Sequence, residues 1–212
     1  MRKLMFIVLS SLAAALLVVV APASGASGGG CQLQGTASFN PGLNSEEKPF
    51  SYNFSGALGG CQSSEAGAPT AGTVEAGKTL AEQVKNSVTG ATDTVTYQQP
   101  MPSGKGGCAS STTAGQALVT WADGTHTVLE YSTTGALAAV SLSGSVTESM
   151  TLTAVNPAAG DPATFTIATN RYAGDSTSGL LAFQPPEPAA CTTATGATTA
   201  AISGTVGLFG SQ

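Results

Sequence analysis

Two segments decide the fold class of this chain: CQLQGTASFNPGL (residues 31–43) and FSYNFSGALGGC (residues 50–61). In both, apolar and polar residues alternate with a period of two, which is the pattern of a β-strand with one buried face. A short polar connection joins the two segments, so they are predicted to pair as an antiparallel hairpin with a cysteine at each outer end. The apolar faces carry Leu33, Gly35, Ala37 and Phe39 on the first strand and Phe50, Tyr52, Phe54, Gly56 and Leu58 on the second.

A second hairpin is indicated downstream, where Asp123-Gly124 lies between the alternating segments 116–121 and 125–131. An Asp-Gly pair favours a tight turn because both central positions take positive φ. The predicted register places Trp121 beside His126, Val119 beside Val128 and Leu118 beside Leu129. Both faces then carry apolar residues, so this pair of strands is predicted to be covered on two sides.

The same alternation continues to the end of the chain and predicts about ten short strands in all. Only residues 78–88 have apolar residues at helical spacing, and a strand fits that segment nearly as well. The fold is therefore predicted to be all-β: a single antiparallel β-sandwich or barrel with at most one short helix. The pattern leaves the choice between sandwich and barrel open.

A glycine recurs at one position of the apolar face in four segments. Glycine weakens a strand, so its repetition suggests a use, either strong bending of the sheet or an aromatic ring lying over bare backbone. Coincidence is the alternative in a chain with 27 glycines. The four segments are Leu33-x-Gly35-x-Ala37, Phe54-x-Gly56-x-Leu58, Leu142-x-Gly144-x-Val146 and Ile202-x-Gly204-x-Val206.

Residues 1–26 have the layout of a secretory signal peptide. Arg2 and Lys3 form a basic start, residues 4–20 are almost wholly apolar, and small residues at 21–26 offer a cleavage site. Residues 27–30 are then predicted to be a flexible leader and residues 31–212 the all-β domain. An uncleaved anchor and a lipid-anchored Cys31 are the alternatives. No later apolar run is long enough to span a bilayer, so the expected location is extracellular or associated with the cell envelope.

Four cysteines in an exported chain predict two disulfides. The pairing Cys31–Cys61 is favoured because both residues lie at matching ends of the first predicted hairpin, which leaves Cys108–Cys191. Loop-closure entropy stabilises the shorter loop by about 3.7 kcal/mol and the longer by about 4.6 kcal/mol. A zinc site is the competing interpretation, but these isolated cysteines lack the close spacing of zinc ligands.

Charge and motifs exclude several classes of partner. The chain has 7 basic and 12 acidic residues, and losing Arg2 and Lys3 with the leader leaves five basic residues and a net charge of −7. No basic stripe of the kind that nucleic acid requires is present. Phosphate-binding loops and dinucleotide fingerprints are also absent, so no cofactor is predicted. The partner stays unknown, with the cell envelope or a carbohydrate as the contacts considered.

No catalytic or metal-ligating residue is assigned. His126 is the single histidine, and cross-strand stacking accounts for it without catalysis. The carboxylate pairs Asp123 with Glu130 and Asp161 with Asp175 are candidates for glycoside hydrolysis, but turn and strand positions favour solvated side chains. The aromatic residues considered for stacking on a sugar are Trp121, Tyr131, Tyr172 and Tyr97, of which core packing better explains the first two.

Four motifs resemble a group of small secreted actinobacterial proteins that are uncharacterised. The motifs are C-x-L-x-G-T-A-x-F-x-P-G-L (31–43), F-S-G-x-L-x-x-C-Q-S-S (54–64), V-T-W-x-D-G (119–124) and G-x-V-G-L (204–208). The resemblance covers most of the mature chain, while residues 78–105 depart from it and look like an insertion. It implies that the four cysteines are structural, and it implies no activity, ligand or catalytic residue.

The sequence therefore predicts a secreted or envelope-associated, non-catalytic β-domain that acts by surface binding or as a structural protein. A secreted hydrolase that uses carboxylates is one alternative, and a carbohydrate- or cell-wall-binding module is another. Two close carboxylates in one pocket would favour the hydrolase. Exposed, coplanar aromatic rings would favour the carbohydrate-binding module.

Overall fold

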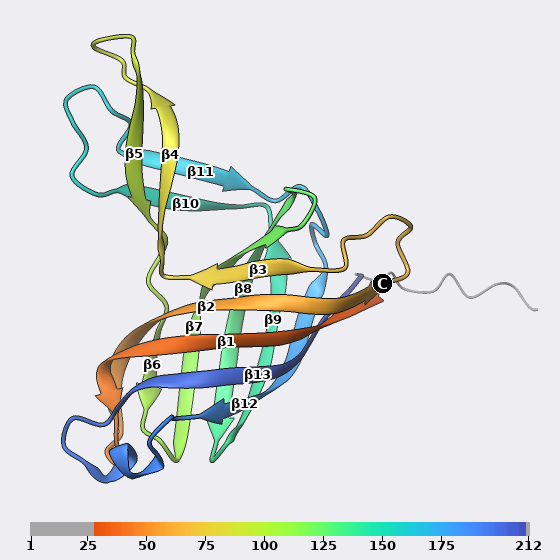
Figure 1. Ribbon diagram of the computed structural model, residues 1–212, viewed down its shortest axis with the longest axis vertical. Helices are drawn as coiled ribbons and strands as arrows, with labels where there is room; N and C mark the ends of the chain where they lie inside the picture. Colours follow the sequence, from red (N-terminus) through yellow and green to blue (C-terminus); the bar gives the residue numbers. More distant parts are fainter. Residues whose placement is uncertain (1–27, 211–212) are drawn as a thin grey trace, which may run out of the picture.

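A computed structural model describes residues 28–210, which form a closed antiparallel β-barrel and a second, smaller sheet (Figure 1). The signal peptide predicted over residues 1–26 lies outside the described residues. Within residues 28–210 there is no α-helix, and the only helical element is a 3-10 turn, η1 (Pro188–Thr192). The strands of this part are β1 (Gly28–Leu43), β2 (Lys48–Ser63), β3 (Gly72–Ala76), β4 (Thr79–Lys85), β5 (Thr92–Gln98), β6 (Ser103–Gly106), β7 (Ser110–Trp121), β8 (His126–Ala136), β9 (Ala139–Thr147), β10 (Ser149–Ala154), β11 (Thr164–Ala168), β12 (Ser176–Gln184) and β13 (Ala197–Phe209).

The barrel closes through pairing of the first two strands. Its order is β1-β13-β12-β9-β8-β7-β3-β2, and β2 pairs back with β1. The short strand β6 pairs with β2 and β7 at the opposite end of the barrel from β3, so the two short strands share one place in the wall. The prediction of an all-β fold with two disulfides is confirmed, and the architecture is a barrel.

The opening hairpin has the predicted inward face. Leu33 lies opposite Leu58, Gly35 opposite Gly56 and Ala37 opposite Phe54. Residues 28–30 were predicted to be a flexible leader, which is wrong for these three glycines: they pair with residues 207–209 as the start of β1. Backbone hydrogen bonding needs no side chain, so the apolar alternation of the sequence gave no sign of this extension.

The recurring glycines have the structural use that their spacing suggests. A Cβ atom on Gly35 would lie 2.5 Å from Cζ of Phe54, and one on Gly56 would lie 2.8 Å from the same atom. The phenylalanine ring therefore lies over bare backbone. At Gly144 and Gly204, a Cβ atom would instead collide with the backbone carbonyl of the neighbouring strand, at Glu130 and Leu180 respectively. These glycines allow the close strand contacts of a tightly coiled wall.

The hairpin of β7 and β8 forms as predicted, but its register is shifted by one residue. Thr120, not Trp121, lies opposite His126, and Leu118 lies opposite Val128. The loop has three residues, not two, because the Trp121 amide bonds to the Thr125 carbonyl oxygen at 2.9 Å. Gly124, with φ of 81°, supplies the left-handed position that such a loop requires.

The second sheet has the order β11-β10-β5-β4 and packs on the outside of the barrel. Leu118 of β7 and Val128 of β8 point away from the lumen into this contact, so the prediction that their hairpin is covered on two sides is confirmed. This second core consists of Val84, Val95, Tyr97, Leu118, Val128, Met150, Leu152 and Ile167.

Of the two conformations that the sequence allows for residues 78–88, a helix or a strand, the structure has the strand. Thr79–Lys85 forms β4 and pairs with β5 along its whole length. Intrinsic helix propensity is a weak preference that tertiary contacts override, so pairing with a neighbouring strand and burial of Val84 decide the conformation of this segment.

Two disulfides tie the ends of the barrel. Cys31–Cys61 joins β1 and β2 at one end, and Cys108–Cys191 joins the loop before β7 to η1 at the other. Both predicted pairings are confirmed, and disulfides are typical of an oxidising environment. None of the helical structure within residues 28–210 is long and apolar enough to cross a membrane.

Candidate ligand-binding cavity

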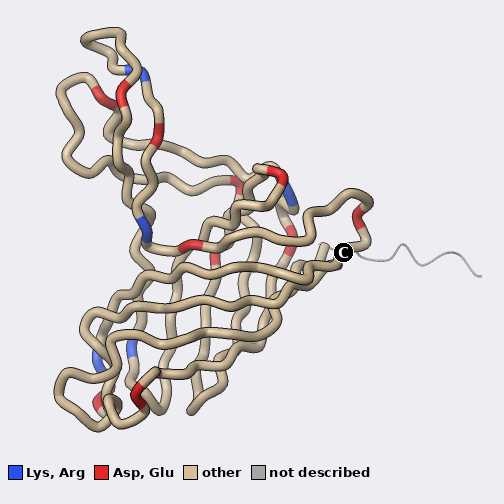
Figure 2. Tube along the Cα trace, in the orientation of Figure 1, with Lys and Arg blue, Asp and Glu red and all other residues tan. Residues whose placement is uncertain are grey.

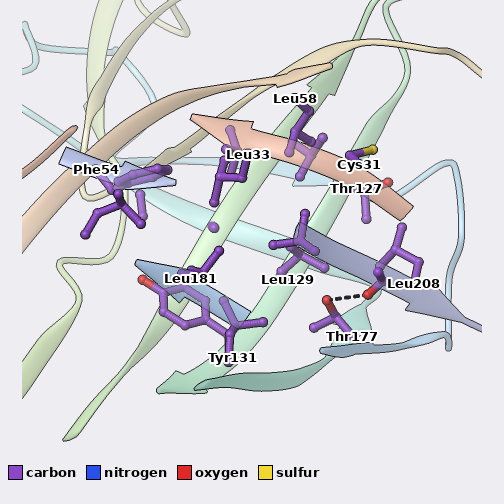
Figure 3. Close-up of a pocket in the computed structure, with 18 of the residues that line it drawn as sticks. Cys31, Leu33, Phe54, Leu58, Thr127, Leu129, Tyr131, Thr177, Leu181 and Leu208 are labelled. Atoms are coloured by element: carbon purple, nitrogen blue, oxygen red, sulfur yellow. Dashed lines mark hydrogen bonds between the residues drawn. The ribbon is translucent and has the colours of Figure 1, made fainter. Parts of the chain in front are cut away.

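The lumen of the barrel contains an apolar cavity of about 170 Å³ (Figure 3). Strands on all sides of the barrel contribute to its walls, because alternate residues of each strand point inward. Figure 3 shows Leu33 of β1, Leu129 and Tyr131 of β8, and Leu181 of β12 directed into this space.

Small residues at inward positions account for the free space. Ala37 and Ala117 line the cavity among much larger neighbours such as Leu33. Gly35 and Gly56 also face inward, but the Phe54 ring covers them. An eight-stranded barrel is just wide enough for its own side chains to fill, or for one small ligand. Each of the two alanines therefore leaves room that a leucine would occupy.

The polar atoms of the cavity wall are largely paired with one another. Nε1 of Trp121 donates to Oγ1 of Thr127 at 2.8 Å, and that hydroxyl donates to the Arg171 carbonyl oxygen at 3.0 Å. The Thr177 hydroxyl donates to the Gly207 carbonyl oxygen at 3.0 Å. Because these groups are already satisfied within the protein, the wall they form behaves as an apolar surface.

Two tyrosines place phenol groups in the lumen. Oη of Tyr52 and Oη of Tyr131 lie 2.7 Å apart, and Tyr52 also lies 3.1 Å from Oγ1 of Thr113. Burial raises the pKa of both phenols, because the charged form loses its hydration. Both tyrosines therefore stay protonated and neutral at physiological pH.

One end of the barrel is covered by the loop between β11 and β12. The Tyr172 ring packs edge-on against Trp121 with ring centroids 5.6 Å apart, and the Arg171 guanidinium lies 5.6 Å from the Tyr172 centroid. Arg171 also pairs with Glu65 at 3.2 Å and with Asp123 at 2.9 Å. A single arginine thus connects three loops at this end of the cavity.

Asp175 is the one carboxylate among the residues that line the cavity within the described part of the chain. Burial raises its pKa, and the negative charge of Glu65 raises it further. Glycoside hydrolysis needs a second carboxylate facing the same substrate. Glu65 does not line the cavity and is paired with Arg171, so the lumen does not present such a pair.

The carboxylates that the sequence analysis considered as pairs do not share a site, and they have separate surroundings. Asp123 pairs with Arg171, whereas Glu130 lies on β8 opposite Gln116 and is exposed. Asp161 accepts a hydrogen bond from the Asn86 side chain at 2.9 Å, in a loop of the second sheet. Within residues 28–210, no three His, Cys, Asp or Glu side chains are grouped closely enough to hold a metal ion.

The single histidine also has a structural contact. Nδ1 of His126 lies 3.3 Å from the Thr120 hydroxyl, its partner across the hairpin. The backbone of His126 holds the loop that carries Arg171, since its carbonyl oxygen accepts from the Asn170 and Arg171 amides at 3.0 and 3.2 Å.

The aromatic residues considered for sugar stacking do not form an exposed platform. Trp121 is 5% exposed and Tyr131 is 8% exposed, and both point into the lumen. Tyr172 is half-buried against Trp121 and also lines the cavity. The structure therefore places Trp121 and Tyr172 in contact at one end of the barrel, and Tyr131 farther along the lumen beside Tyr52.

Sequence reasoning did not identify the lumen hydroxyls as a group. Tyr52 was assigned to the apolar face of its strand, and Thr113 and Thr133 were not singled out. Their signal in the sequence is weak: Thr113 shares its face with Ala117 and Val119, and Thr133 shares its face with Leu129 and Tyr131. A hydroxyl at an otherwise apolar inward position is the feature that would have identified them.

No family model, curated protein or solved structure matches this chain.

Proposed function

We propose that the protein is a secreted, non-catalytic binding protein that holds a small, uncharged, apolar molecule in the lumen of its barrel. The observation that carries this proposal is the cavity of about 170 Å³ with apolar walls. An apolar cavity of about 150 Å³ is sufficient to bind benzene. Transfer of an apolar molecule from water into such a site is favourable by roughly 25 cal/mol for each Å² of its surface that is buried.

The distribution of charge supports an uncharged ligand. Charged residues lie near the ends of the barrel, on the second sheet and, as Glu75 and Glu130, on β3 and β8, while the wall formed by β1, β13, β12 and β9 carries none (Figure 2). Among the described residues, Asp175 is the single charged side chain on the cavity lining. An anionic ligand in the lumen would lose its hydration and lie near Asp175 without gaining a partner of opposite charge, which is unfavourable.

The proposal includes export from the cytoplasm. It is supported by the basic and apolar pattern of residues 1–26 and by the two disulfides, which persist in oxidising compartments. It also includes kinship with the uncharacterised secreted proteins of actinobacteria, since residues of the shared motifs have structural roles here, among them Cys31, Gly35 and Gly124. The intact mass of the protein recovered from culture medium tests export. We expect the mass of the chain without its leader, and a mass that includes the leader would contradict the proposal.

The two alternative functions have less support. A carboxylate-dependent hydrolase would need a second acidic group beside Asp175 in the lumen. A carbohydrate-binding module would need exposed aromatic rings, whereas Trp121 and Tyr131 are buried.

Titration of the purified protein with toluene, followed by NMR of the leucine methyl groups, tests the proposed function. Toluene is expected to shift the methyl resonances of Leu33, Leu129 and Leu181, which line the cavity, and to leave those of Leu180 unchanged. Leu180 lies on the outer face of β12 and is 62% exposed. Shifts that are absent, or that spread evenly over exposed and lumenal methyl groups, would contradict the proposal.

A matched pair of variants locates the binding site. Leu129→Trp places an indole in the lumen and is expected to weaken toluene binding at least tenfold, since it takes up much of the space. Leu180→Trp makes the same substitution on the outer face of the barrel and should leave binding unchanged. Equal effects of the two substitutions would place the site outside the lumen.

A further inference from the structure

Four hydroxyl groups form a continuous chain on the lumen wall. Oη of Tyr131 lies 2.7 Å from Oη of Tyr52, which lies 3.1 Å from Oγ1 of Thr113, and that oxygen lies 2.8 Å from Oγ1 of Thr133. The groups come from β8, β2 and β7, and all four residues line the cavity. This chain of hydroxyl groups is the main polar feature of a largely apolar lumen.

The four hydroxyl groups carry one more proton than the hydrogen bonds among them can use. Each hydroxyl carries one proton, so four protons serve three bonds. These four oxygens make no other hydrogen bond to a residue in the range 28–210. In every arrangement of the three bonds, one hydroxyl can donate to a molecule in the cavity. The bonds can also reverse direction, because either partner can be the donor in each.

Tyr131 is the member of the chain best placed to contact a ligand. Its oxygen has one partner, Tyr52, whereas the oxygens of Tyr52 and Thr113 have two each. Thr133 also has one partner, but it is half-buried, while Tyr131 is 8% exposed. A buried hydroxyl with unused hydrogen-bonding capacity gains more from a ligand oxygen than one that water can reach.

We propose that the lumen selects an apolar molecule bearing one neutral oxygen function, a hydroxyl or a carbonyl, and that this oxygen bonds to the Tyr131 hydroxyl. This inference rests on the proposed function, because it names the chemistry of the molecule that the cavity holds. The hydroxyl chain can bind either kind of oxygen. When its hydrogen bonds run in one direction, the Tyr131 hydroxyl donates to a ligand carbonyl. When they run in the other direction, it accepts a hydrogen bond from a ligand hydroxyl.

Charged oxygen groups fit this site poorly. The phenols of Tyr52 and Tyr131 are neutral, and no basic side chain lines the cavity within the described residues. A carboxylate or phosphate group would therefore be buried without a cation to balance it. The site favours alcohols, phenols, ketones and similar neutral molecules over acids.

Phenol and toluene test the inference as a matched pair of probes, since they have nearly the same shape and differ by a hydroxyl in place of a methyl group. Their dissociation constants are measured by NMR titration for the unaltered protein and for Tyr131→Phe. Phenol is expected to bind the variant about three- to tenfold more weakly, the effect of one neutral hydrogen bond. Toluene should bind both proteins with affinities within about twofold, because its contacts are apolar.

Tyr97→Phe is the control variant. It also removes one phenol hydroxyl from a residue with no exposed surface, but that hydroxyl donates to the Pro162 carbonyl oxygen at 3.1 Å in the second sheet. It should leave the affinities for phenol and toluene unchanged. The Cζ resonance of Tyr131 in the unaltered protein gives a second measurement that does not depend on a variant folding. It should shift more with phenol than with toluene, while that of Tyr97 should not move.

The outcomes separate the inference from the proposed function. A selective loss of phenol affinity in Tyr131→Phe, with the Tyr131 resonance responding to phenol, supports the inference. If Tyr131→Phe changes phenol and toluene binding equally, or the Tyr131 resonance does not distinguish the probes, the inference is wrong while lumenal binding stands. If neither probe binds the unaltered protein, both proposals fail.

Discussion

At the scale of single residues, the glycines of the inner face determine how closely rings and neighbouring strands approach the wall. Gly35 and Gly56 face each other across β1 and β2, and the Phe54 ring covers both. Their repeated spacing was visible in the sequence. The sequence did not show whether each glycine makes room for an aromatic ring or for a closely approaching strand. A ring over Gly35 and a strand close to Gly144 give the same sequence pattern.

Gly35→Ala should destabilise the barrel. A Cβ atom at this position would lie 2.5 Å from both Cζ of Phe54 and the Ser55 carbonyl oxygen, and the backbone contact cannot be relieved by a side-chain rotation. We expect a loss of about 1–3 kcal/mol in the free energy of unfolding, the usual cost of overpacking, measured by urea denaturation. Gly59→Ala in the neighbouring strand β2 is the control, since its Cβ atom would meet nothing within 4 Å, and its effect should stay within about 0.5 kcal/mol. Equal effects would contradict the role assigned to Gly35.

At the scale of elements, local patterns identified most strands but not their partners. The alternation in the first hairpin and the Asp123-Gly124 turn predicted the correct elements. The register at that turn was off by one residue, because the same dipeptide also fits a three-residue loop with glycine in the left-handed position. Residues 78–88 have apolar residues that satisfy a helix and a strand alike, and their pairing with β5 decided between them.

The loop from β11 to β12 should give the protein an unusual response to pH through Asp175. Its folded-state pKa is raised by burial and by Glu65, so its ionised form opposes folding, and the stability present at low pH is lost as the pH rises through that raised pKa. Asp175→Asn should therefore raise the melting temperature at pH 7. The difference should vanish below the ordinary carboxyl pKa of 3.8, where the aspartate is protonated in both states.

Asp123→Asn provides a control of opposite sign. The pKa of Asp123 is lowered chiefly by hydrogen bonds from Thr125, and Arg171 lowers it further. Its ionised form favours the folded state, so this variant should lower the melting temperature at pH 7, with the difference closing as the pH falls through the lowered pKa. Changes of the same sign in the two variants would contradict the assigned environments.

At the scale of the whole molecule, the sequence predicted an all-β fold with the correct disulfides. It did not predict that the sheet closes into a barrel or that the barrel contains a cavity. Closure depends on β1 pairing with both β2 and β13, a long-range choice that alternation within a strand does not encode. The size of the cavity depends on the summed volumes of the side chains that point inward from all the strands of the wall. Ala117 and Leu129 are both apolar residues in a sequence pattern, yet one leaves room in the lumen and the other contacts whatever occupies it.

The central claim is that the barrel lumen is an apolar cavity able to hold a small molecule. Crystals of the protein pressurised with xenon test it most directly, because xenon enters apolar cavities of this size without any hydrogen bond. We expect xenon electron density inside the barrel, in contact with Leu33, Leu129 and Leu181, at higher occupancy than at any other position in the molecule. A lumen without xenon, closed by its own side chains or filled by ordered water, would contradict the claim.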